Sequence, residues 1–117
     1  MATHTILFSW QRSLPVCVKT SPNHFVDFVP YLGGMQQNGT IESFVPVFMT
    51  PSGGANMGGF FLILGAGDKL HGMAESDDWL GHITRANVHL QGLALLQGVT
   101  GDELYRRFEL WSQFVES

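Results

Sequence analysis

Residues 39–65 read GTIESFVPVFMTPSGGANMGGFFLILG, a stretch that predicts two β-strands and the connection between them. The first predicted strand, residues 41–50, is rich in Val and Phe, and the second, residues 59–64, is a short apolar run. β-Branched and aromatic side chains suit the pleated, packed surface of a sheet. Pro51, Ser52, Gly53 and Gly54 are turn formers. The stretch therefore predicts a hairpin around which the remaining elements are arranged.

The first strand of this hairpin is apolar on both of its faces. Alternation places Ile41, Ser43, Val45, Val47 and Met49 on one face and Glu42, Phe44, Pro46 and Phe48 on the other. Pro46 has no N–H to donate to a neighbouring strand, which predicts an edge position or a bulge. An edge strand with two apolar faces favours a sheet whose second face packs on another subunit.

Before the hairpin, the sequence predicts a strand, a loop and a helix. Residues 3–11 alternate, and the even positions His4, Ile6, Phe8 and Trp10 form the predicted core face. Residues 12–23 contain two prolines and are expected to be a long loop. Residues 25–37 carry a helical apolar stripe interrupted by Pro30, which predicts a kinked or late-starting helix ending at Asn38-Gly39.

After the hairpin, a turn at residues 65–67 is followed by a short helix through residue 73, with Asp68 as the predicted cap. The turn lacks the third small residue of a dinucleotide fingerprint, because Leu70 stands there. Ser76 is expected to cap a helix over residues 76–86. Residues 88–97 then predict a last strand.

Thr100 and Glu103 match a capping box in front of a C-terminal amphipathic helix. The predicted element order is therefore β-α-β-β-α-β plus this helix. That order is typical of an α+β, ferredoxin-like fold with a four-stranded antiparallel sheet. Its helices cover one sheet face, and the other face must be buried elsewhere.

Composition limits the classes of function. A chain of 117 residues fits one domain spanning residues 1–117, and its 14% charged residues favour self-association into a homodimer. The net charge of −4 and the absence of a basic stripe argue against nucleic-acid binding. No apolar run approaches the ~20 residues of a membrane span, so we expect a cytoplasmic protein without a membrane partner. Cys17 is the single cysteine, and the scattered histidines predict no metal site.

Residues 39–108 resemble small bacterial proteins of the dimeric α+β-barrel superfamily. The matching features are GTIESFVPV at 39–47, GG followed by GFFLIL at 59–64, KLHGMAESDDW at 69–79, and VHLQG at 88–92 with a following TG. Such relatives include cofactor-independent monooxygenases of antibiotic biosynthesis, muconolactone-isomerase-like proteins and uncharacterised groups. The resemblance implies two sheets that face each other in a dimer and enclose a cavity, with no cofactor.

Strand alternation nominates the side chains that line such a cavity. The candidate ligand-binding residues are Ser9, Gln11, Ser43, His89 and Gln91. His89 and Gln91 are assigned to the cavity because Val88, Leu90, Gly92, Ala94 and Leu96 form a face with no polar side chain. Mostly apolar walls with a few polar groups suit a small, partly hydrophobic molecule. No catalytic residue is assigned.

Two functions remain open at this stage. The first is non-catalytic binding of a small, partly hydrophobic molecule between the sheets. The second is a cofactor-independent monooxygenase or isomerase acting on an aromatic or polyketide-like substrate. We favour the first, since no general base with an evident orienting partner can be named from the sequence.

Overall fold

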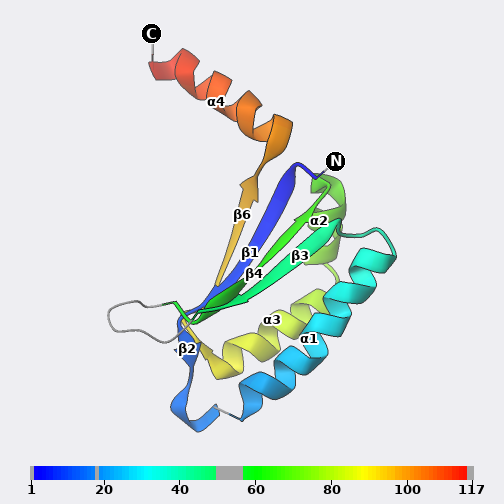
Figure 1. The fold of residues 1–117 in the computed structure, drawn as a ribbon, viewed down its shortest axis with the longest axis vertical. Helices are drawn as coiled ribbons and strands as arrows, with labels where there is room; N and C mark the ends of the chain where they lie inside the picture. The colour runs from blue at the N-terminus through cyan, green and yellow to red at the C-terminus, as the bar shows by residue number, and fades with distance from the viewer. Residues whose placement is uncertain (1, 18, 50–56, 116–117) are drawn as a thin grey trace.

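Four strands form an antiparallel sheet in the order β3-β4-β1-β6 (Figure 1). The central strands are β1 (His4–Trp10) and β4 (Gly59–Gly65), and the edge strands are β3 (Ser43–Phe48) and β6 (Ala94–Val99). This computed structural model describes residues 2–17, 19–49 and 57–115. The protein is therefore an α+β protein built on a four-stranded antiparallel sheet, as the sequence predicts.

Three helices cover one face of this sheet, and a fourth extends away from the end of β6 (Figure 1). They are α1 (Thr20–Gln37), α2 (Gly67–Ala74), α3 (Asp77–His89) and α4 (Gly101–Val115). A second, two-stranded sheet pairs β2 (Arg12–Ser13) with β5 (Leu90–Gln91), and a 3-10 helix spans Pro15–Cys17. No helix in the described ranges has the length and apolar character needed to cross a membrane.

The predicted hairpin is confirmed in both of its strands. β3 lies at an edge of the sheet, as the missing N–H of Pro46 requires. β4 alternates between buried and partly buried residues along its length. The predicted connection through Pro51, Ser52, Gly53 and Gly54 lies outside the described residues.

The core lies between the sheet and α1, α2 and α3. Ile6, Phe8 and Trp10 are buried, which confirms the predicted core face of β1. The Phe8 ring packs 5.0 Å from that of Phe28 and 5.7 Å from that of Phe61, measured between centroids. An aromatic cluster thus joins the middle of the sheet to α1.

The segment before α1 differs from the predicted loop. Residues 12–13 pair with β5, and α1 begins at Thr20, earlier than the stripe predicts, and continues through Pro30. Ser21 and His24 extend the buried face of α1 toward its start, although both side chains are polar. The predicted end of the helix is confirmed, because Gly39 adopts a left-handed φ of 83° directly after Asn38.

Two of the predicted helix caps have different outcomes. The Ser76 side chain accepts a hydrogen bond from the backbone N–H of Trp79 and caps α3, as predicted. Asp68 lies inside the first turn of α2, whose cap is Ala66. The predicted cap was wrong because the chain enters helical geometry two residues earlier than Asp68 suggests.

The capping box before α4 is not formed reciprocally. The Thr100 N–H donates to the carbonyl of Thr3 at 3.0 Å, which ties the residue to the start of β1. The carboxylate of Glu103 instead accepts hydrogen bonds from Arg106 and Arg107. These pairs lie along the outside of the helix.

The sheet face opposite α1, α2 and α3, here called the open sheet face, carries no charged side chain. The strand register places four triplets on it: Thr5, Leu7 and Ser9; Ser43, Val45 and Val47; Phe60, Leu62 and Leu64; and Ala94, Leu96 and Gly98. Val45 and Leu96 are 46% and 56% exposed. No described helix packs on this apolar surface (Figure 1).

Candidate functional site

The five predicted site residues do not come together in the structure. Ser9 and Ser43 lie on the open sheet face, as predicted. Gln11 lies in the bend after β1, and Gln91 belongs to the two-stranded sheet, where its Oε1 accepts from Arg12 Nε at 2.7 Å. His89 is the last residue of α3, and its ring is fully buried on the helix side of the sheet. Their predicted placement on one cavity wall was therefore wrong for His89 and Gln91.

The error arises from where α3 ends. The predicted strand 88–97 begins two residues inside α3, which continues to His89. β5 then occupies only two residues, and Gly92 turns the chain with a φ of 71° before β6 begins. Alternation of apolar residues runs through all three segments, so period-2 spacing alone does not separate them.

Five polar side chains form a continuous hydrogen-bonded row between α1, α3 and β2, here called the serine–histidine chain. Ser13 Oγ donates to Ser21 Oγ at 2.5 Å, and Ser21 Oγ lies 2.6 Å from His89 Nδ1. His89 Nε2 lies 2.8 Å from His24 Nδ1, and His24 Nε2 lies 3.1 Å from His82 Nδ1. Ser21, His24 and His89 are buried, whereas His82 is partly exposed.

Each element positions a different part of this chain. Ser21 and His24 lie three residues apart on one face of α1, and His82 and His89 lie seven apart on one face of α3. The β2–β5 pairing sets Ser13 opposite Leu90, and the Leu14 N–H donates to the His89 carbonyl at 2.9 Å. These helical spacings are visible in the sequence, whereas the contact between the two helices is not.

The direction of each contact to a histidine depends on the tautomers of the three rings, and the following assignment is one that satisfies all four contacts. Because the Ser13 hydroxyl donates to Ser21, the Ser21 proton is available for His89 Nδ1. A neutral His89 then carries its single proton on Nε2 and donates to His24, which donates in turn to His82. Both ring nitrogens of His24 are thus occupied by other histidines. No group of His, Cys, Asp or Glu in the described ranges is arranged to hold a metal ion.

Burial keeps these histidines neutral. It lowers the pKa of His24 from 6.5 to about 4, and the Arg85 guanidinium acts in the same direction. Burial followed by the Arg85 charge also lowers the pKa of His82 and of His89. Arg85 itself pairs with Asp27 at 2.7 Å across α1 and α3. A neutral His89 with an unprotonated Nδ1 is able to act as a base near pH 7.

The serine end of the serine–histidine chain borders an apolar cavity of about 460 Å³, here called the aromatic pocket. Its walls are formed by Trp10, Ser13, Ser21, Pro22, Phe25 and Phe48. The Trp10 and Phe25 rings lie 4.9 Å apart, and Phe48 packs against both. Ser13 and Ser21 thus place hydroxyl groups in an otherwise apolar wall.

This arrangement has two chemical capacities. His89 is able to take a proton from a ligand through the Ser21 hydroxyl, with His24 fixing the orientation of its ring. It is also able to increase the nucleophilicity of Ser21 Oγ. The sequence predicts neither capacity, since it does not reveal that these residues meet.

Comparisons of the chain with protein-family models, curated proteins and solved structures gave no match.

Proposed function

We propose that this protein binds a small, partly hydrophobic aromatic molecule in the aromatic pocket, with a polar group of that molecule facing Ser13 and Ser21. The observation that carries this proposal is the contact between the serine–histidine chain and the pocket wall. A cavity of about 460 Å³ falls within the roughly 300–1,000 Å³ of small-molecule sites. Three aromatic rings supply apolar contact, and the hydroxyls supply orientation.

The cavity between two sheets, which the sequence analysis favours, is a less well supported location for the ligand. His89 and Gln91, two of its five proposed lining residues, lie elsewhere in the structure. The proposed ligand is a small, partly hydrophobic molecule in both cases, and the aromatic pocket is its proposed site.

A proton-transfer enzyme is the second candidate function, favoured by the 2.6 Å contact between Ser21 Oγ and His89 Nδ1. In an isomerase, a proton leaves a carbon next to a carbonyl, passes to His89 through the Ser21 hydroxyl, and returns to a different carbon. No oxidant is needed for that step. A cofactor-independent monooxygenase would use the same base, with dioxygen as oxidant: a methylene becomes a carbonyl and the second oxygen leaves as water.

Binding in the aromatic pocket is tested with 2-naphthol and its methyl ether. We expect Ser21→Ala to weaken 2-naphthol binding roughly tenfold, since one hydrogen bond to the ligand is lost. Binding of the methyl ether, which has no hydroxyl proton to donate to the chain, should change little. Calorimetry measures both affinities, and Ser112→Ala on α4 is the matched control. Equal effects on the two ligands, or no binding of either at millimolar concentration, would contradict the proposed site.

The same preparation separates binding from catalysis. In deuterium oxide, an enzyme of this kind should speed deuterium incorporation next to the carbonyl of 2-tetralone, and His89→Gln should abolish the increase. Incorporation no faster than in buffer would contradict the catalytic function, and ligand binding would be the function that is still supported.

We also propose that two copies pair through the open sheet face. Its twelve positions carry no charge, so a two-fold contact brings no like charges together. The strand order 3-4-1-6 supports the ferredoxin-like arrangement, and two such sheets facing each other would form the dimeric barrel. Large apolar faces are rarely left exposed on monomers.

Pairing predicts a dimer in sedimentation at micromolar concentration, burying more than ~1,000 Å² in total. Val45→Asp places a charge on the open sheet face and should shift the protein to the 12.9 kDa monomer. Val26→Asp, at a 71% exposed position on α1, is the control and should leave the dimer intact. A wild-type protein that sediments only as the monomer would refute the pairing.

A further inference from the structure

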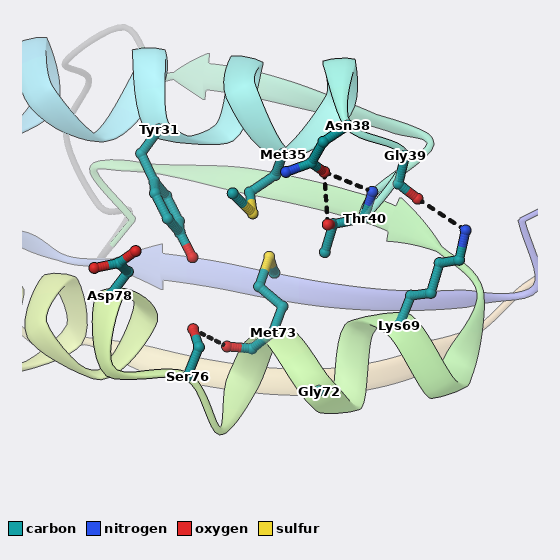
Figure 2. A pocket seen from close by; sticks show the side chains of 10 residues that line it. All are labelled: Tyr31, Met35, Asn38, Gly39, Thr40, Lys69, Gly72, Met73, Ser76 and Asp78. Atoms are coloured by element: carbon teal, nitrogen blue, oxygen red, sulfur yellow. Dashed lines mark hydrogen bonds between the residues drawn. The ribbon is translucent and has the colours of Figure 1, made fainter.

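A second cavity, of about 430 Å³, lies between the C-terminal half of α1, α2 and the start of α3, on the far side of His82 from the aromatic pocket. Figure 2 shows Met35 and Met73 facing each other in its middle. Tyr31 and Asp78 lie toward one end and Lys69 toward the other. The cavity therefore has an apolar centre, an acidic end and a basic end.

The hydroxyl of Tyr31 is a group in this cavity that lacks a fully formed hydrogen bond. Its oxygen is buried, and the Ser76 hydroxyl, although close enough to act on the pKa of Tyr31 through a hydrogen bond, is not in full hydrogen-bond geometry with it. The ring is held in place by the His82 ring, 4.6 Å away between centroids, and by the ring of Phe28. Figure 2 shows the hydroxyl directed toward Ser76 and Asp78. Buried polar groups in native proteins are nearly always hydrogen-bonded, so this hydroxyl indicates a missing partner.

The carboxylate of Asp78 lies at the same end of the cavity, and this residue is exposed. It lies close enough to Tyr31 to affect it electrostatically, yet no described residue donates a hydrogen bond to it or pairs with it. The nearby Ser76 hydroxyl donates to the carbonyl of Met73 at 2.7 Å, which uses its proton. An ammonium group, which carries several N–H donors and a positive charge, would hydrogen-bond to both Asp78 and Tyr31 Oη.

The other end of the cavity has the opposite charge. Lys69 Nζ donates to the carbonyl of Gly39 at 3.2 Å and remains exposed. An ammonium group has three donors, so two remain for a ligand. Because Lys69 repels a second cation, a diamine does not suit this end, whereas an anionic group does.

We propose that this cavity is a binding site for an elongated ω-amino carboxylate. The ammonium group of the ligand donates to Asp78 and Tyr31 Oη, and its methylene chain lies between Met35 and Met73. Its carboxylate faces Lys69. The flexible thioether side chains suit an unbranched chain. This site shares no lining residue with the aromatic pocket, so a negative result at one site does not contradict the proposal for the other.

The test compares 6-aminohexanoate with hexylamine and hexanoate by calorimetry on the full chain. We expect 6-aminohexanoate to bind at least fivefold more tightly than either single-ended compound. Asp78→Asn should weaken its binding about tenfold or more, and Tyr31→Phe severalfold. The matched control is Asp77→Asn, which removes the neighbouring carboxylate outside the cavity and should have no effect. Lys69→Met should remove the preference for 6-aminohexanoate over hexylamine.

Other results would overturn the assignment. Hexanoate binding as tightly as 6-aminohexanoate would show that Asp78 does not receive an ammonium group. Equal effects of Asp77→Asn and Asp78→Asn would mean that only the overall charge of α3 matters. If none of the three compounds gives a heat of binding at millimolar concentration, the proposed binding site is wrong. Circular dichroism of each variant establishes that loss of binding is not loss of folding.

Discussion

Phe8→Ala is expected to lower the free energy of unfolding by roughly 3–5 kcal/mol. Phe8 is fully buried in the centre of the sheet, and its ring contacts those of Trp10, Phe28 and Phe61. Truncation removes the apolar contact and leaves a cavity between β1 and α1 that rigid neighbours cannot fill. Since whole domains are stable by only about 5–15 kcal/mol, this single change threatens folding.

Urea unfolding measures this loss, and Phe48→Ala is the matched control. Phe48 is 63% exposed at the end of the edge strand, although its ring touches Trp10 and Phe25. Its truncation should cost roughly 1 kcal/mol, the size of a typical surface-proximal change. Similar losses for the two variants would show that the core is not centred on Phe8.

Acid is expected to destabilise the protein by about 3 kcal/mol through His24 alone. The folded pKa of His24 is lowered from 6.5 to about 4, chiefly by burial. Between these pH values the unfolded chain binds a proton that the folded protein does not. The free energy of unfolding should therefore be constant with respect to this group above about pH 6.5 and fall as the pH decreases toward 4. His82 and His89, whose pKa values are also lowered, add to the fall in the same direction.

Urea midpoints between pH 4.5 and 7.5 give this slope for the wild type and for His24→Gln. The variant should show a shallower slope, whatever its overall stability, because one proton-binding group is gone. Ser112→Ala on α4, which removes no titratable group, should leave the slope unchanged. A His24 ring that titrates near pH 6.5 by NMR would mean that the serine–histidine chain is open to water.

The strands of the main sheet were predictable because their signals are local. β3 and β4 lie in runs of β-branched, aromatic and other apolar residues, and Pro46 identifies an edge from its missing N–H alone. The core face of β1 follows from the alternation of Ile6, Phe8 and Trp10 with smaller or more polar residues. These features depend on backbone geometry, which is the same wherever the strand is placed.

The last predicted strand failed because two periodicities compete over the same residues. Val88 to Leu96 alternate as a strand would, yet Trp79, Ala86 and His89 continue the buried face of a helix. Because Leu90 pairs with Ser13, the polypeptide continues neither as the α3 helix nor as one long strand, and it turns at Gly92. Ser13 and Leu90 are 77 positions apart, so the local pattern of residues around either one does not predict that they pair.

The sequence by itself determined the core face of β1, the edge position of β3, and where α1 ends and α3 begins. Packing of α1 against α3 decided the candidate site. Ser21 and His89 are 68 positions apart, and His24 and His82 are 58 apart. A polar side chain on a helix can be buried only where a partner satisfies it, and that partner is supplied by another element. The serine–histidine chain is therefore a property of the tertiary structure: its five residues can be read in the sequence, but the contacts between them cannot.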